Sequence, residues 1–241
     1  RAALEAQWRP GAQRGRYRYT WSFNPDGSEG TVLWPDKIHA RSGYKWVYPV
    51  HEVLAREDGR SETAAEVVVL QGVQLNHHPD PTKSRAQYLP LLELSVLEIP
   101  DDARTAHYLG REYMFHRQWR KCIEMLTLHL NMPGATWREE RCASCRFIAR
   151  AHANLGERRD ARAALFRAIA EAPWLREPYF EMARLLLNDG EFAGAAFMAR
   201  QALAIQTRPE VYISEDAAWG DELPRLLERA QTELKRTLLI K

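Results

Sequence analysis

The chain has 241 residues, enough to bury a sizeable core in one large domain or two smaller ones. Hydrophobic residues make up 45% and charged residues 27%, an ordinary balance for a globular protein, and the net charge is +2. This near-neutral charge gives no electrostatic reason to expect a nucleic-acid partner. No apolar run approaches the roughly 20 residues that cross a bilayer, so we expect no membrane span.

Residues 16–78 have the patterning of β-strands. Large aromatic side chains alternate with other residues over 16–23, the period of two that indicates a strand. The sequence Asn24-Pro-Asp-Gly27 then predicts a turn that reverses the chain. Further short strands are predicted at 31–34, 37–40, 66–70 and 73–77. Gly72 separates the last two, and a helix is predicted over 88–97.

After Asp102, a predicted helix N-cap, the hydrophobic period becomes helical and the sequence repeats. The step from Ala161 to Ala195 is 34 residues, the tetratricopeptide period. The step from Cys122 to Ala161 is five residues longer, and we expect the loop 131–135 to absorb the difference.

Small and turn-forming residues fall where paired helices require them. Alanines at 161, 168, 195 and 202 allow the second helix of each pair to approach the first. Gly156 and Gly190 suit the turn within a pair, Pro173 ends a pair, and a capping helix is predicted over 223–239. The predicted fold class is α+β, with a small β-rich region in residues 1–100 and an all-α tetratricopeptide-like array in residues 101–241.

The three cysteines form an odd set, in which Cys142 and Cys145 make a Cys-x-x-Cys pair. Because neither a second pair nor a nearby histidine completes a zinc site, we expect packed thiols rather than a zinc or redox centre. Cysteines without disulfide partners fit a reducing compartment, so the predicted location is cytoplasmic.

The segment from Lys37 to Tyr88 concentrates residues that carry chemistry. It contains Pro49-Val-His-Glu52, then Leu75-Asn-His77, then Lys83-Ser-Arg85 three residues before Tyr88. These elements, in this order and followed by helical repeats, resemble the acceptor-side half of a family 2 glycosyltransferase that carries C-terminal tetratricopeptide repeats. The resemblance covers residues 16–100 and implies part of a glycosyltransferase A-type fold.

The resemblance also implies a site. Sugar transfer with inversion requires a base for the acceptor and a cation or basic groups for the leaving diphosphate. Glu52 is the predicted catalytic base, with His51 beside it, and His77 is the predicted ligand of Mn²⁺ or Mg²⁺. The predicted substrate-binding residues are Lys83 and Arg85 for the diphosphate of a nucleotide-sugar donor, and Arg41, Trp46 and Tyr48 for a protein or glycan acceptor.

Simpler interpretations stand beside these roles. His51 can serve only to hold a strand end, His77 can lie in a solvated turn, and Lys83 and Arg85 can be surface charges of a helix. The Trp and Tyr side chains of residues 17–48 can be sheet core. The histidines in the helical region are expected to be packing or surface residues; they are His107, His116, His129 and His152.

Two functions therefore remain open. Enzymes of this family begin with a nucleotide-binding half that carries an Asp-x-Asp motif, which this sequence lacks, so we expect the chain to be the C-terminal portion of such an enzyme. The alternative is a non-catalytic interaction module in which the repeat groove binds a protein partner and the β-rich region is a structural cap.

Overall fold

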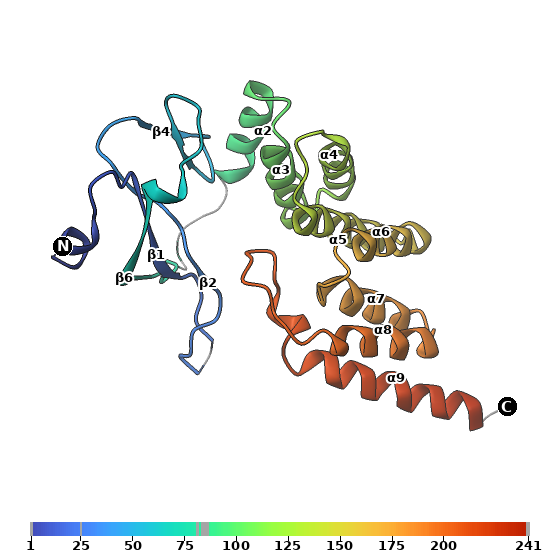
Figure 1. Ribbon diagram of the computed structural model, residues 1–241. Coiled ribbons are helices and arrows are strands. Elements are labelled where there is room, and N and C mark those ends of the chain that lie inside the picture. The colour runs from blue at the N-terminus through green and yellow to red at the C-terminus, as the bar shows by residue number, and fades with distance from the viewer. Residues whose placement is uncertain (1, 25, 81, 83–86, 240–241) are drawn as a thin grey trace. The chain divides into compact units, whose positions relative to one another are not determined.

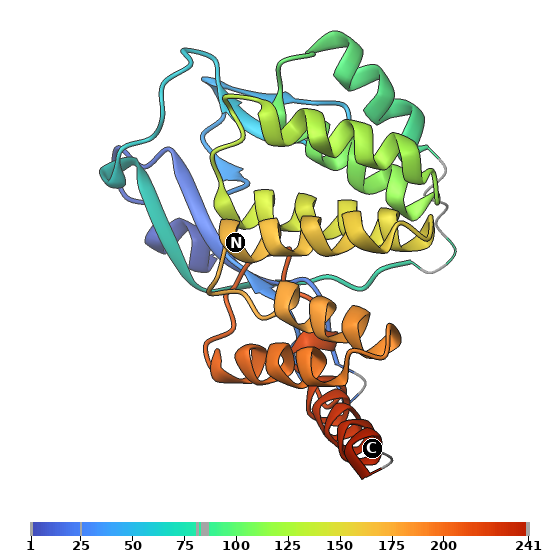
Figure 2. The same ribbon diagram turned by 90° about the vertical axis from the view of Figure 1, so that its right-hand side faces the viewer.

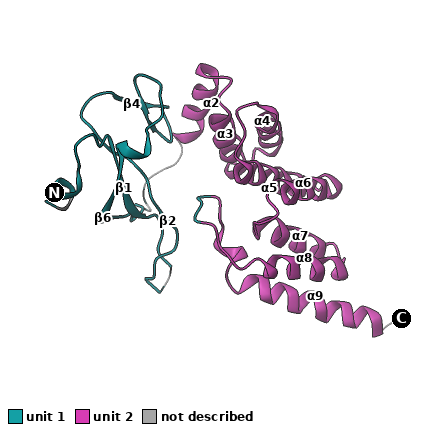
Figure 3. Cartoon of the chain, viewed as in Figure 1, with its two compact units in different colours: residues 1–86, 210–212 teal, residues 87–209, 213–241 magenta. Residues whose placement is uncertain are grey.

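A computed structural model describes residues 2–24, 26–80, 82 and 87–239. The chain divides into two compact units, residues 1–86 with 210–212 and residues 87–209 with 213–241 (Figure 3). The sequence predicted a division at residue 100 instead. Helix α2 (Tyr88–Glu98) belongs to the second unit, because it packs against the first helix of the array.

The first unit is built around strand β1 (Arg14–Thr20), which pairs with three other strands. It is antiparallel to β2 and β3 and parallel to β6, while β4 and β5 form a separate antiparallel hairpin. The other elements are α1 (Ala2–Gln7), β2 (Val32–Leu33), β3 (Ile38–His39), β4 (Tyr44–Val47), β5 (Val53–Arg56), η1 (Ala64–Glu66) and β6 (Val67–Asn76). The predicted turn is confirmed, since the Gly27 N–H donates to the Asn24 carbonyl over 2.9 Å and β1 and β2 run in opposite directions.

Strand β6 corrects the prediction that Gly72 separates two strands. The strand is continuous, and Gly72 adopts a left-handed φ of 69° within it. The register against β1 changes from Arg16 opposite Val69 to Arg18 opposite Gln74, so extra residues of β6 bulge out between these pairs. Glycine accommodates this backbone conformation at no steric cost, which explains why the pattern looked broken there.

The core of the first unit is small and leaves several tryptophans at the surface. Tyr17 and Leu70 are buried in it, whereas Trp21, Trp34 and Trp46 are 49%, 42% and 50% exposed. The interpretation of the aromatic residues as sheet core is therefore right for Tyr17 and wrong for these three tryptophans.

The second unit consists of helix pairs, which Figures 1 and 2 show lying side by side in alternating directions. The helices after α2 are α3 (Ala103–Phe115), α4 (Trp119–Asn131), α5 (Arg138–Asn154), α6 (Arg158–Glu171), α7 (Glu177–Asn188), α8 (Phe192–Ala204) and α9 (Glu222–Leu239), with the short η2 (Asp216–Ala218) before α9. The pairs are α3 with α4, α5 with α6 and α7 with α8, and α9 packs on α8 as the predicted cap.

The small residues of the repeat lie where the helices meet. Ala161 and Ala168 on α6 and Ala195 and Ala202 on α8 are completely buried, as the period predicted. The Asp102 side chain accepts a hydrogen bond of 2.7 Å from the Thr105 N–H, which confirms the predicted N-cap of α3. These local signals therefore define a tetratricopeptide-like array from the helices of this chain alone.

The five extra residues between the first and second repeats lengthen a helix, which corrects the prediction that the loop absorbs them. Helix α5 has 17 residues, whereas α3 has 13 and α7 has 12. Its added first turn carries Arg141, which donates to the carbonyls of Leu130 and Ala135 over 3.0 and 3.1 Å. The same guanidinium donates to Glu171 of α6, so the extra turn ties the first pair to the second.

Candidate functional site

The β4–β5 hairpin presents the Pro49-Val-His-Glu52 sequence in its loop. Tyr48 and His51 both have left-handed backbone conformations, with φ of 71° and 56°. Such conformations are strained in residues other than glycine and are found at functional loops more often than elsewhere. Val50 is buried, His51 is half-buried, and Glu52 is exposed where β5 begins. The loop therefore holds a carboxylate in solvent on a constrained backbone.

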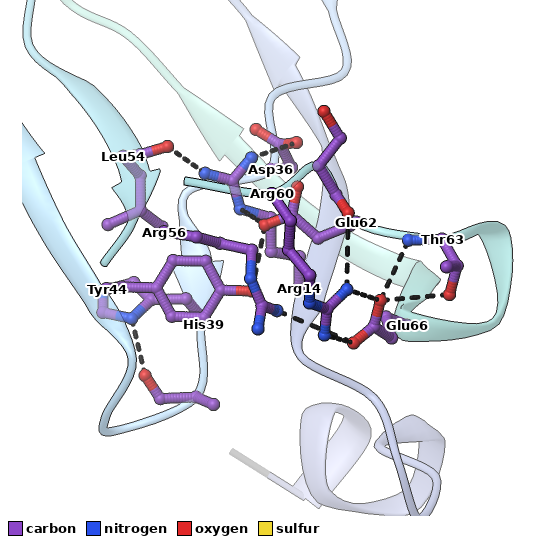
Figure 4. Close-up of polar contacts among 12 residues, drawn as sticks. Arg14, Asp36, His39, Tyr44, Leu54, Arg56, Arg60, Glu62, Thr63 and Glu66 are labelled. Carbon is purple, nitrogen blue, oxygen red and sulfur yellow. Dashed lines mark hydrogen bonds and ion pairs between the residues drawn. The ribbon is translucent and has the colours of Figure 1, made fainter. Parts of the chain in front are cut away.

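Arg14 anchors this hairpin to the main sheet (Figure 4). The guanidinium is buried, lies 3.0 Å from the Asp36 carboxylate and 3.1 Å from that of Glu62, and donates to the Leu54 carbonyl of β5. The Tyr44 ring of β4 lies 5.3 Å from the Arg14 guanidinium carbon, and its hydroxyl donates to Glu62 over 3.0 Å. Burial, followed by the Glu62 carboxylate, raises the pKa of Tyr44. These contacts fix the position of the loop.

Neighbouring carboxylates are neutralised by arginines and so are poor candidates for acid–base chemistry. The Arg56 guanidinium holds the pKa of Asp58 well below its usual range, and Arg60 does the same for Glu66 (Figure 4). Glu66 also accepts from the Thr63 N–H over 2.9 Å in a capping box. A paired carboxylate with a lowered pKa is a weak proton acceptor at neutral pH.

Trp46 and Arg41 both lie near His39. Lys37 Nζ lies 5.6 Å from the centre of the Trp46 ring, and the His39 ring lies edge-on at 6.2 Å. An open concavity of about 520 Å³ is lined by Leu4, Glu5, Trp8, Ile38, His39, Ala40 and Arg41. The volume is within the range of small-molecule sites, roughly 300–1,000 Å³, and its lining joins apolar surface to a guanidinium.

His77 is held at the end of β6 by backbone and ring contacts. Its N–H donates to the Thr20 carbonyl over 2.9 Å, and its ring stacks on exposed Trp21 with the centroids 4.5 Å apart. His77 Nδ1 lies 3.1 Å from the Trp21 carbonyl oxygen, which can only accept, so Nδ1 is the donor in this contact. The adjacent His78 stacks on Phe23 instead, at 5.2 Å.

The described contacts thus distribute the predicted residues over three places in the first unit. Tyr48, His51 and Glu52 share the hairpin loop, Arg41 and Trp46 share the surroundings of His39, and His77 lies beside Trp21. Lys83 and Arg85 lie outside the residues that the structure describes. The roles of all these residues in catalysis or binding stay predictions.

The three cysteines confirm the prediction of packed thiols. All are buried and free, and burial raises the pKa of Cys122 and of Cys145 to about 12. Burial likewise raises the pKa of Cys142 far above its usual range. Thiolate is the form that binds metals and attacks disulfides, so the Cys-x-x-Cys pair lacks the reactive species.

Sequence reasoning missed how the array holds the segment of residues 213–219. The Glu215 carboxylate lies 2.9 Å from Arg146 and 2.6 Å from Arg150, both on α5. Glu177, at the start of α7, accepts hydrogen bonds of 2.9–3.0 Å from the Ser214 hydroxyl, the Glu215 N–H and the Trp219 indole. Pairs separated by this many residues leave no local signal in a sequence.

Within the residues that the structure describes, no helix is both long and apolar enough to cross a membrane. The fold and these sites define a class: a helical-repeat protein with a small β-rich unit at its N-terminal side.

No protein-family model matches the chain, and no curated protein matches it. Similar solved structures include a crystal structure of MamA, at 18% identity and a TM-score of 0.45, covering 67% of this chain and 99% of that one. They also include the TPR2B domain of yeast Sti1 in a complex with pHsp70 (19%, 0.44, covering 54% and 97%) and the Sgt2 TPR domain from Aspergillus fumigatus (16%, 0.44, covering 56% and 80%). At these scores and identities, the assignment of the array rests on the helices of this chain.

Proposed function

We propose that the helical array is a docking scaffold for a partner protein that presents an extended acidic segment. The observation that carries this proposal is the way α5 and α7 hold residues 213–219. Paired arginines take the Glu215 carboxylate, Arg146 also donates to the Ile213 carbonyl over 3.4 Å, and Glu177 takes a backbone N–H. These are the contacts by which a helical surface recognises an extended chain with a carboxylate.

Helix α3, the first helix of the array's first pair, carries a row of arginine and aromatic side chains. Arg104, Tyr108, Arg111 and Phe115 are spaced by four, three and four residues, so they lie on one face of the helix. Both guanidinium carbons lie over the Tyr108 ring, at 4.9 and 4.7 Å, and Phe115 is 55% exposed. An arginine stacked on an aromatic ring joins a positive charge to an apolar surface. An acidic segment with apolar residues therefore complements this row.

The scaffold proposal is tested by selecting peptides against the full chain and measuring their affinity by fluorescence anisotropy. Selected peptides should be enriched in Asp and Glu, and the Arg104→Glu/Arg111→Glu variant should bind them at least about tenfold more weakly. Arg159→Glu/Arg200→Glu is the matched control, because it makes the same charge change on exposed positions of α6 and α8. Equal losses in both variants, or peptides without acidic enrichment, would refute the proposal.

A second candidate function concerns the first unit, and the geometry of His77 favours it. Metal-binding histidines almost always donate their other ring N–H to a carboxylate, a carbonyl or water. The Nδ1 contact with the Trp21 carbonyl has this form and leaves Nε2 as a ligand atom. We therefore propose that the first unit is the acceptor side of a glycosyltransferase A-type domain, with His77 as a ligand of Mn²⁺ or Mg²⁺.

In this function, Glu52 would deprotonate the acceptor, and His77 would hold a cation that, together with basic groups, would stabilise the departing diphosphate of the nucleotide-sugar donor. The strained backbone at His51 supports a catalytic loop at Glu52. The exposed face of Trp46 and the Arg41 guanidinium offer an acceptor an apolar surface and a hydrogen-bond donor.

The transferase proposal is tested by thermal unfolding with and without Mn²⁺ and a nucleoside diphosphate. Binding to the folded chain should raise the Tm, and His77→Ala should abolish the rise. His78→Ala is the matched control and should keep it. No rise in the unaltered chain, or an unchanged rise in His77→Ala, would contradict the assignment of His77.

A further inference from the structure

Three consecutive helices of the array bring two histidines and a glutamate together in its interior. His107 comes from α3, His129 from α4 and Glu140 from α5, and all three side chains are buried. One ligand atom from each residue lies within 4.8 Å of the other two. His129 Nε2 and Glu140 Oε1 are 3.5 Å apart.

Ser144 on α5 lies between the two imidazoles. Its hydroxyl oxygen is 2.8 Å from His107 Nδ1 and 2.9 Å from His129 Nδ1. Both rings are thereby fixed by their Nδ1 atoms, and both Nε2 atoms are left for another partner. This is the arrangement by which a hydroxyl or carbonyl orients histidine ligands around a metal ion.

The two Nε2 atoms are completely buried and make no hydrogen bond to any residue that the structure describes. The contact between His129 and Glu140 is an ion-pair distance without hydrogen-bond geometry. A buried polar atom without a partner destabilises the folded state, so two such atoms in one cluster require an explanation.

We propose that His107 Nε2, His129 Nε2 and a Glu140 carboxylate oxygen bind a zinc-class divalent cation that crosslinks α3, α4 and α5. Bonds of about 2.0–2.1 Å at tetrahedral angles place neighbouring ligand atoms roughly 3.3–3.5 Å apart. The distance between His129 Nε2 and Glu140 Oε1 already has this value, and one ring nitrogen of His107 lies within 4.8 Å of a ligand atom of each of the other two residues. Two imidazoles and one carboxylate form a common set of protein zinc ligands, and water completes the fourth position.

The hydrogen bonds of Ser144 are consistent with both states of the cluster. Without metal, its hydroxyl accepts from one Nδ1–H and donates to the other Nδ1. With metal on both Nε2 atoms, both rings carry their hydrogen on Nδ1, and the Ser144 oxygen accepts from both. The two states of the cluster therefore differ in the tautomer of one ring.

Another group of possible ligands in the array differs from this cluster in its burial. His152 and Glu157 are only partly buried and Asp160 is exposed. His152 Nδ1 already lies 2.7 Å from Glu157, which also pairs with Arg120. This group is therefore satisfied by surface ion pairs. It supplies a control on helices of the same array.

The test uses the full chain after EDTA treatment, reloading with zinc and removal of unbound metal, followed by zinc analysis by mass spectrometry. We expect about one zinc per chain and a higher Tm for the loaded protein. His107→Gln and Glu140→Gln should lose this zinc, whereas His152→Gln and His77→Ala should retain it. The last control separates this site from the metal proposed at His77.

Ser144→Ala provides a measurement that does not depend on removing a ligand. It should weaken zinc binding by about 10–100-fold, as outer-sphere substitutions do, while circular dichroism shows an unchanged helix content. Cobalt in place of zinc should give the visible absorption of a four-coordinate site in the unaltered chain. The proposal is overturned if the unaltered chain retains no zinc after reloading, or if zinc content and affinity are the same in Glu140→Gln and Ser144→Ala as in the unaltered chain.

Discussion

The substitution Gly110→Ala is expected to destabilise the array, although alanine is the better helix former. Gly110 lies within α3, where a Cβ would come within 2.4 Å of both Cγ and Cδ2 of Leu126 and 3.3 Å from its backbone nitrogen. Carbon atoms in contact lie about 3.5–4.0 Å apart, so Leu126 has to retreat by more than 1 Å. Leu126 is completely buried on α4, so this movement has to take place within the core.

Two opposing terms set the magnitude. Replacing glycine by alanine in a helix gains about 1 kcal/mol, and overpacking a tight core costs about 1–3 kcal/mol. Because the clash at Gly110 involves the branch point of Leu126 and also approaches its backbone, we place the cost at the upper end. The net loss is then about 1–2 kcal/mol, which lowers the Tm by about 2–8 °C in a protein of this size.

Urea denaturation followed by circular dichroism measures this loss, with Gly194→Ala as the matched control. At Gly194 on α8, the new Cβ would lie 3.2 Å from a single methyl carbon of Leu186, which a small rotation relieves. This control should be neutral or stabilised by up to about 1 kcal/mol. If Gly110→Ala unfolds at the same urea concentration as the unaltered chain, or a higher one, the close approach of α3 and α4 is wrong.

Three further predictions concern the second unit. Burial disfavours the charge of Glu181, but Arg146 and Arg150 lower its pKa to about 2. The ionised carboxylate therefore stabilises the fold fully above about pH 4.5, and this stabilisation is lost as the pH falls towards 2. Urea denaturation across this pH range should show a flatter stability–pH profile for Glu181→Gln than for the unaltered chain. Asp102→Ala should cost about 1 kcal/mol in the same assay because it removes the N-cap of α3, and Asp101→Ala should cost less than half of that. The buried thiols of Cys122, Cys142 and Cys145 should not react with a thiol reagent at pH 8 in the native protein during the time in which they react completely in urea. Rapid modification of the native protein would contradict their burial.

The array could be predicted because its determinants are local. The alanines at 161 and 195, the N-cap at Asp102 and the turn at Gly156 each act within a few residues of chain, and the 34-residue step repeats them. The error at the loop 131–135 arose because a helix of 17 residues and a longer loop give the same repeat length. A period measures the length of a repeat and leaves open which element contains the extra residues.

The strands around the candidate site were predicted less well, because their signals are short and depend on distant partners. The hairpin of residues 44–56 has four residues in each strand, and the bounds of neither strand were predicted. The bulge at Gly72 looked like a break between two strands. The exposed tryptophans were also ambiguous, since the alternation that marks a strand does not say which face is buried.

The polar clusters show why sites are harder to predict than helices. Glu177 meets Trp219 across 42 residues, and His107 meets Ser144 across 37. Neither pair has a characteristic spacing in the sequence, because each depends on how two helices stack. That stacking is determined by side chains far apart along the chain. Of these four residues, the sequence pointed to His107 alone, as a packing or surface residue. A residue's interior position on a repeat helix can therefore be predicted from periodicity, but the chemistry that its side chain takes part in follows only from which other helix lies against it.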